Sequence, residues 1–134
     1  MPVKVVDASA LAALLFGEPE AEIVASQLEH HTLAAPTILP FEIASVCLKK
    51  LRRHKEQREA IVTAYALLDR LAIEYVQIHF SEVIALAERS KLTVYDAAYL
   101  WLAQSLNAEL VTLDSSLARA AQRPTHKPKA GKGQ

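Results

Sequence analysis

Short apolar runs alternate along the chain with longer segments whose apolar residues recur at helical spacing. The short runs are typical of strands buried on both faces of a sheet, and they predict strands at residues 3–6, 32–35, 75–78 and 109–113. The longer segments predict helices at residues 8–16, 19–29, 39–54, 56–72, 81–89, 95–106 and 117–122. This alternation predicts an α/β fold of three layers, in which helices cover both faces of a central parallel sheet of four to five short strands.

The chain of 134 residues has the length of one domain. Residues 123–134 differ from the rest, since they contain four bases, two prolines, two glycines and no acid. We therefore expect a folded domain at residues 1–122 and a basic, disordered tail at residues 123–134. The formal net charge of zero then leaves this domain with eleven bases against fifteen acids. A nucleic-acid partner would have to meet local basic patches or metal ions.

The single cysteine, Cys47, excludes an internal disulfide and argues against a thiolate metal cluster. No apolar run approaches the roughly 20 residues that a membrane-spanning helix needs. The first residues also lack the long apolar stretch of a signal peptide. We expect a cytoplasmic protein that does not contact a membrane.

Four acidic residues follow or precede the predicted strands at equivalent places. Asp7 and Asp114 come directly after the first and last strands, and Glu42 and Asp96 lie in the first turns of two helices. In open α/β sheets, ligands bind beyond the carboxyl ends of the strands. All four acids can therefore reach one edge of the sheet. Asp69, the remaining aspartate, is expected on a solvated helix face.

Each of these acids also has a local explanation that needs no site. Asp7 and Asp114 are residues of the type that caps helix starts, and Glu42 places a favourable charge in a first helical turn. Asp96 is the last residue of a capping box that begins at Thr93. A second role is compatible with all of these, because four carboxylates at one edge repel one another strongly unless a cation lies among them.

The type of ligand indicates the type of metal. Carboxylates without clustered cysteine or histidine favour the hard cations Mg²⁺ and Mn²⁺. Such ions polarise a phosphate, activate a water molecule and stabilise a leaving oxygen. The adjacent pair His30-His31 lacks the spacing of two ligands on one helix face, and we interpret it as a loop before the second strand. Zinc is therefore poorly supported.

These residues resemble the PIN-domain family, and more closely the VapC toxins of toxin–antitoxin pairs. The resemblance covers residues 3–122 and rests on Val-Val-Asp-Ala-Ser at 5–9, on residues 35–44, on Thr-Val-Tyr-Asp-Ala-Ala-Tyr-Leu at 93–100 and on Val-Thr-Leu-Asp at 111–114. An isolated Asp-x-Ser carries no information, whereas the segment Tyr-Asp-Ala-Ala-Tyr-Leu is fairly specific. The order and spacing of all four segments together make the resemblance strong.

The resemblance implies a complete site. The catalytic, metal-binding acids would be Asp7, Glu42, Asp96 and Asp114, with Ser9 and Thr112 as accessory polar residues beside the metal. Family members hydrolyse RNA with Mg²⁺ or Mn²⁺, often form homodimers and are silenced by a small antitoxin protein. The chain departs from the family at its C-terminus, where a basic tail stands in place of a further short strand.

The densest run of bases begins on the helix that carries Glu42. We predict RNA contacts there, as a phosphate track toward the acids, at Lys49, Lys50, Arg52, Arg53 and Lys55. The alternative is a solvated helix end, because cations are favourable at a helix C-terminus. Four apolar residues of the first helix are expected to be mostly core, with part of their surface open to an antitoxin helix: Leu11, Leu14, Leu15 and Phe16.

Two other classes of function compete with a metal-dependent ribonuclease. A catalytically silent PIN-like module would bind RNA or a protein without cutting, but such a module has no need of four intact acids. A receiver-like signalling domain also uses acids at strand ends with Mg²⁺. That reading needs a phosphorylatable aspartate in mid-chain and a lysine after a late strand, and the sequence offers neither.

Overall fold

The computed structural model describes residues 2–123, so the predicted tail, apart from Arg123, lies outside the described residues. Its four parallel strands form one sheet in the order β3-β2-β1-β4. The strands are β1 (Val3–Val6), β2 (Thr32–Pro36), β3 (Ile73–Val76) and β4 (Glu109–Val111). Because β1 is paired on both sides, the residue that follows it is enclosed by its neighbours.

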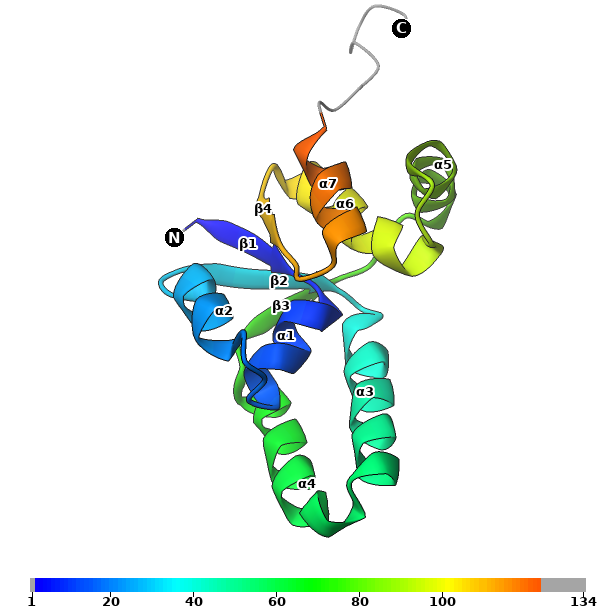
Figure 1. The fold of residues 1–134 in the computed structure, drawn as a ribbon. Helices are drawn as coiled ribbons and strands as arrows, with labels where there is room; N and C mark the ends of the chain where they lie inside the picture. Colours follow the sequence, from blue (N-terminus) through cyan, green and yellow to red (C-terminus); the bar gives the residue numbers. More distant parts are fainter. Residues whose placement is uncertain (1, 124–134) are drawn as a thin grey trace, which may run out of the picture.

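Helices cover both faces of this sheet, as predicted. The α-helices are α1 (Ala8–Leu15), α2 (Ala21–Leu28), α3 (Leu39–Arg53), α4 (Arg58–Ala66), α5 (Phe80–Ser90), α6 (Val94–Leu106) and α7 (Ser115–Gln122). Helix α6 packs on β1, β2 and β4 and carries α5 and α7 on its own flanks. Helices α1 and α2 pack together, and α3 and α4 form a long hairpin that extends away from the sheet (Figure 1). None of the helices in residues 2–123 is long and apolar enough to cross a membrane.

The core lies between the sheet and these two helical layers. Its centre consists of fully enclosed side chains from β1, α1, α3 and α6, among them Val5, Leu11, Ile43 and Leu102. The apolar helix predicted at residues 95–106 is α6, in which six residues are buried. A helix with apolar side chains on nearly all sides can fold stably only when neighbours surround it.

Three local predictions were wrong. The helix expected at residues 56–72 is interrupted, because the 3₁₀ turns η1 (Lys55–Gln57) and η2 (Leu67–Arg70) flank a shorter α4. Strand β3 begins two residues earlier than predicted, since pairing with β2 aligns Ile73 with Leu33. Strand β4 ends at Val111, two residues before its predicted end. In each case, contacts with neighbouring elements set the boundary, and the local apolar pattern extends past it.

Candidate functional site

Asp7 is the buried centre of the candidate site. It follows β1 in the middle of the sheet, and it is the one charged residue among those described that is buried, with 4 % of its surface exposed. Its carboxylate caps α1 by accepting from the backbone N–H of Ala10 at 3.0 Å. It also accepts from the hydroxyls of Ser9 at 2.8 Å and Thr112 at 2.5 Å. The predicted cap is therefore real, and the two accessory residues are in contact with this acid.

Thr112 joins Asp7 to Asp114. Its hydroxyl donates to Asp7 and accepts from the backbone N–H of Asp114 at 3.0 Å. Asp114 itself caps α7, because its carboxylate accepts from the backbone N–H of Leu117 at 2.8 Å. The prediction that Asp114 directly follows the last strand was wrong, since two residues separate it from β4. The short turn after β4 nevertheless returns Asp114 to the end of the sheet where Asp7 lies.

Glu42 and Asp96 come from the first turns of α3 and α6. Glu42 is half-buried, and its Oε1 accepts a hydrogen bond of 2.5 Å from the hydroxyl of Tyr99. The backbone N–H of Asp96 donates to Thr93 Oγ1 at 3.1 Å, which is one half of the predicted capping box. Within residues 2–123, no hydrogen bond or ion pair reaches the Asp96 carboxylate. The two helix starts thus present one anchored and one unanchored carboxylate.

The four acids lie close enough to perturb one another. Burial raises the pKa of Asp7, and the charge of Asp114 raises it further, against three hydrogen bonds that lower it. Burial likewise raises the pKa of Glu42, with repulsion from Asp96 and Asp7. Burial also raises the pKa of Asp96, with repulsion from Asp114 and Asp7. The structure therefore brings all four predicted acids together at the carboxyl end of the sheet.

A divalent cation fits the chemistry of this arrangement. Burial is the main cause of the raised pKa values, and repulsion among the acids adds to it. A cation among the carboxylates would offset that repulsion, and oxygen ligands favour Mg²⁺ or Mn²⁺ over softer metals. Within the described part of the chain, no three acid, histidine or cysteine side chains converge into a ready-made ligand cage. Mg²⁺ does not require one, since it commonly keeps several waters and binds one or two carboxylates together with substrate phosphate.

The predicted basic run lies at the far end of α3 from Glu42. Arg53, at the end of that helix, lies eleven positions after Glu42, which corresponds to roughly 17 Å along the helix axis. Lys50 is engaged with the turn after α1, where it pairs with Glu18 and lies over the Phe16 ring. Lys49, Arg52, Arg53 and Lys55 are exposed. The structure does not bring this group to the acids, and RNA binding by it stays a prediction.

The residues considered for an antitoxin surface are mostly core, as expected. Leu11 and Leu15 are buried, and Leu14 and Phe16 pack against the core while keeping part of their surface exposed. His30 and His31 both lie in the turn before β2, as the loop interpretation predicted, and His30 is exposed. Asp69 is exposed too, although it lies in a 3₁₀ turn instead of a helix.

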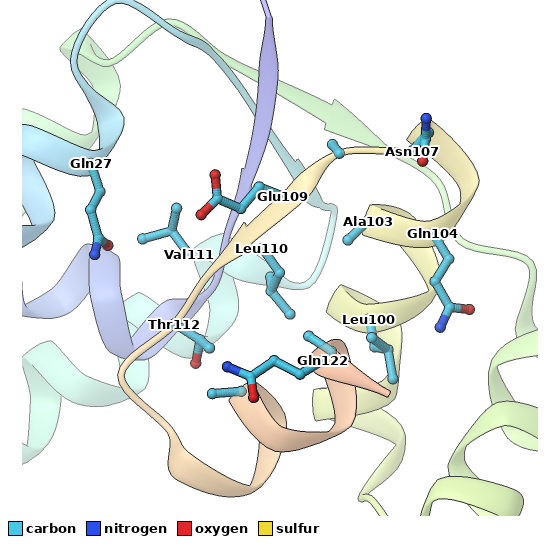
Figure 2. A pocket seen from close by; sticks show the side chains of 13 residues that line it. Gln27, Leu100, Ala103, Gln104, Asn107, Glu109, Leu110, Val111, Thr112 and Gln122 are labelled. Carbon is cyan, nitrogen blue, oxygen red and sulfur yellow. The ribbon is translucent and has the colours of Figure 1, made fainter. Parts of the chain in front are cut away.

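A pocket runs along the open edge of β4, between that strand, α6 and α7 (Figure 2). Thr112 lies at one end of it, and amide side chains such as Gln104 and Gln122 line its walls. None of the four acids lines this pocket, and Glu109 is the one carboxylate in its wall. The pocket therefore borders the site through Thr112, but the four acids lie outside it.

Sequence reasoning missed Tyr99 as a member of the site. Its side chain is 1 % exposed, and its position three residues after Asp96 places it on the same side of α6. A tyrosine buried in an apolar helix must still find a partner for its hydroxyl. From the sequence, that requirement could have indicated that the hydroxyl of Tyr99 bonds to a polar residue, but only the folded structure identifies Glu42 as its partner.

Comparison with known proteins identifies the family of this chain. The family model of the PIN domain matches residues 4–123. Ribonuclease VapC3 of Pyrobaculum aerophilum is 34 % identical over 122 residues, which cover 85 % of this chain and 91 % of that protein. The crystal structure of PAE2754 from Pyrobaculum aerophilum matches with a TM-score of 0.73 and 25 % identity, over 90 % of this chain and 86 % of the other. The fold and the site define a PIN-domain protein, and the chain belongs to this family. Within the family it is of the VapC type.

Proposed function

We propose that this protein is a metal-dependent ribonuclease that hydrolyses RNA phosphodiester bonds and acts as the toxin of a toxin–antitoxin pair. The observation that carries the proposal is the meeting of Asp7, Glu42, Asp96 and Asp114 at one end of the sheet, where each perturbed acid is affected by the charge of another. The name of the relative ribonuclease VapC3 supports RNA as the substrate. Mg²⁺ or Mn²⁺ is the proposed cofactor, because carboxylate oxygens are the ligands available.

The bound metal would supply polarisation of the scissile phosphate and stabilisation of the leaving oxygen. The protein's own residues divide the remaining work. Ser9 and Thr112 hold Asp7 in one orientation through their hydroxyls, so its carboxylate does not have to reorganise during the reaction. Asp96 keeps its carboxylate free of protein donors within residues 2–123, and its pKa is raised by burial and by Asp114. Those properties suit a group that accepts the proton of an attacking water.

The proposed partners are an RNA substrate, a small antitoxin protein and a second copy of this chain. The name of the relative ribonuclease VapC3 supports an antitoxin partner. Large apolar side chains exposed on the described surface are the candidates for contacts with protein partners. The most exposed of them are Phe41, Phe80, Ile23, Tyr95 and Ile84. Light scattering on the purified protein tests the homodimer directly, because a monomer at micromolar concentration would exclude it.

The nuclease is tested by incubating the purified, antitoxin-free protein with a structured RNA in Mg²⁺, in Mn²⁺ and in excess EDTA. Asp96→Asn is expected to abolish cleavage with the fold intact, because it removes charge but little volume. Asp69→Asn is the matched control, since that exposed aspartate lies outside the site, and it should cleave normally. A folded protein that binds RNA but cuts none in any metal would favour the silent binding module instead.

A further inference from the structure

Tyr99 occupies an unusual place for a polar side chain. It is the largest fully buried side chain in the described part of the protein, and its ring belongs to the core that α6 forms with the sheet. Its hydroxyl emerges from that core beside the acids and donates to Glu42 Oε1 at 2.5 Å. Since 57 positions separate the two residues, this bond is a tertiary contact between α6 and α3.

The orientation of the Glu42 carboxylate depends on this one contact. Asp7 accepts three hydrogen bonds, and Asp114 is fixed by capping α7. Among residues 2–123, Tyr99 is the sole hydrogen-bond donor to the Glu42 side chain, and Glu42 takes part in no ion pair. A glutamate has more rotatable bonds than an aspartate, so a half-buried one without an anchor samples several orientations.

We propose that Tyr99 is a positioning residue of the nuclease site. Its enclosed ring holds the hydroxyl at a fixed point, the hydroxyl holds Oε1 of Glu42, and the second carboxylate oxygen of Glu42 is thereby left for the divalent cation. This inference rests on the proposed function, because it assigns Tyr99 a role toward the metal of that site. The competing explanation is that Tyr99 merely fills the core and that Glu42 satisfies its hydroxyl.

The two explanations differ in what the loss of the hydroxyl does. Partners that orient a metal ligand typically change metal affinity or activity by about 10- to 100-fold when they are removed. A hydroxyl that only satisfies a core tyrosine affects folding and leaves metal binding unchanged. Tyr99→Phe separates these effects, since it keeps the buried ring and removes one atom.

The experiment compares Tyr99→Phe with Tyr65→Phe in the full-length protein. Tyr65 is half-buried on α4, packs against the same core and makes no hydrogen bond to an acid among the described residues. Three quantities are measured: Mn²⁺ affinity by titration calorimetry without RNA, kcat and KM for RNA cleavage, and melting temperature in EDTA. Tyr99→Phe is expected to weaken Mn²⁺ binding and lower kcat by about 10-fold or more, with KM for RNA unchanged. Tyr65→Phe should leave Mn²⁺ affinity and kcat unaltered.

A double-mutant cycle tests whether Tyr99 acts through Glu42. In a Glu42→Ala background, Tyr99→Phe should change Mn²⁺ affinity by less than about twofold, because the group it positions is already gone. An undiminished effect in that background would overturn the assignment. So would an unchanged Mn²⁺ affinity in the single Tyr99→Phe variant, whatever its melting temperature. If the unaltered protein bound no Mn²⁺ and cut no RNA, the proposed function would fail together with this inference. Normal metal binding and cleavage by both Tyr99→Phe and the unaltered protein would remove the inference alone.

Discussion

Replacing Thr112 by valine tests how the buried charge of Asp7 is tolerated. The substitution keeps the shape of the side chain and removes a hydroxyl that donates to Asp7 Oδ2 at 2.5 Å and accepts from the backbone N–H of Asp114 at 3.0 Å. Asp7 is only 4 % exposed, so water has little access with which to replace the lost donor. The half-exposed N–H of Asp114 can be rehydrated more easily.

The expected cost follows from these two contacts. A hydrogen bond to a charged group contributes about 1.5–3 kcal/mol, and a neutral one about 0.5–1.5 kcal/mol. Because water can partly replace the second bond, we expect the free energy of unfolding to fall by about 2–3 kcal/mol in metal-free protein near neutral pH. For a domain of this size, that loss corresponds to a melting temperature lower by on the order of 10 °C.

The loss of stability caused by Thr112→Val should depend on pH, and the pKa of Asp7 determines in which direction. The Thr112 bond lowers the pKa of Asp7, against burial, which raises it above its ordinary value of 3.8. Its removal therefore raises this pKa further, and the charge-assisted part of the cost exists only while Asp7 is ionised. The difference between variant and parent should be largest above the raised pKa and should shrink as the pH falls toward the ordinary value.

Urea unfolding in EDTA, followed by circular dichroism near pH 7.5 and near pH 4.5, measures both effects. Thr32→Val is the control, since Thr32 is exposed on β2 and its hydroxyl makes no hydrogen bond among the described residues; it should change stability by less than about 0.5 kcal/mol. A loss below about 0.5 kcal/mol for Thr112→Val near neutral pH would refute the reasoning. An equal loss at both pH values would show that the ionised state of Asp7 is not what Thr112 stabilises.

Two further predictions concern the core and the charge of the four acids. Leu11→Ala should lower the free energy of unfolding by about 2–5 kcal/mol in urea titrations, because Leu11 is fully buried; a loss under about 1 kcal/mol would contradict its central placement. In EDTA, the pKa values of Asp7, Glu42 and Asp96 are raised in the folded protein above the ordinary values of 3.8 to 4.5. In the pH window between the ordinary and the raised values, the folded protein therefore binds more protons than the unfolded chain. The melting temperature should therefore fall as the pH rises through that window and should be restored at neutral pH by Mn²⁺; a profile that is flat with and without Mn²⁺ would count against a metal site.

Much of the fold could be predicted from the sequence because local physics dictates it. The short run Val3–Val6 forms a strand whose last two residues are buried, and the largely apolar sequence of α6 favours a place inside the fold. Asp7, Thr93 and Asp114 each cap a helix, so the same short-range hydrogen bonds that start α1, α6 and α7 also fix where the turns before these helices lie. The PIN-domain prediction followed from those turns, and the family match over residues 4–123 confirms it.

Predictions failed where no local signal exists. The apolar pattern continues past β3 into residues 77 and 78, so it could not reveal that the strand ends at Val76. Of the two 3₁₀ turns around α4, η1 lies at the turn between α3 and α4 and η2 lies between α4 and β3, and no breaker residue in the sequence indicates either of them. The basic run was expected to lead toward the acids, yet the axis of α3 carries it roughly 17 Å away.

The sequence by itself determined the α/β alternation, the helix caps and the identity of the four acids, because strand burial and capping depend on neighbours within a few residues. Only the tertiary structure decided how those acids relate to one another. Strand order places Asp7 at the centre of the sheet, where burial raises its pKa. The fold also brings the hydroxyl of Tyr99 on α6 within hydrogen-bond distance of Glu42 on α3. Such contacts join residues more than fifty positions apart, and their energies depend on distances and burial that exist only after the chain has folded.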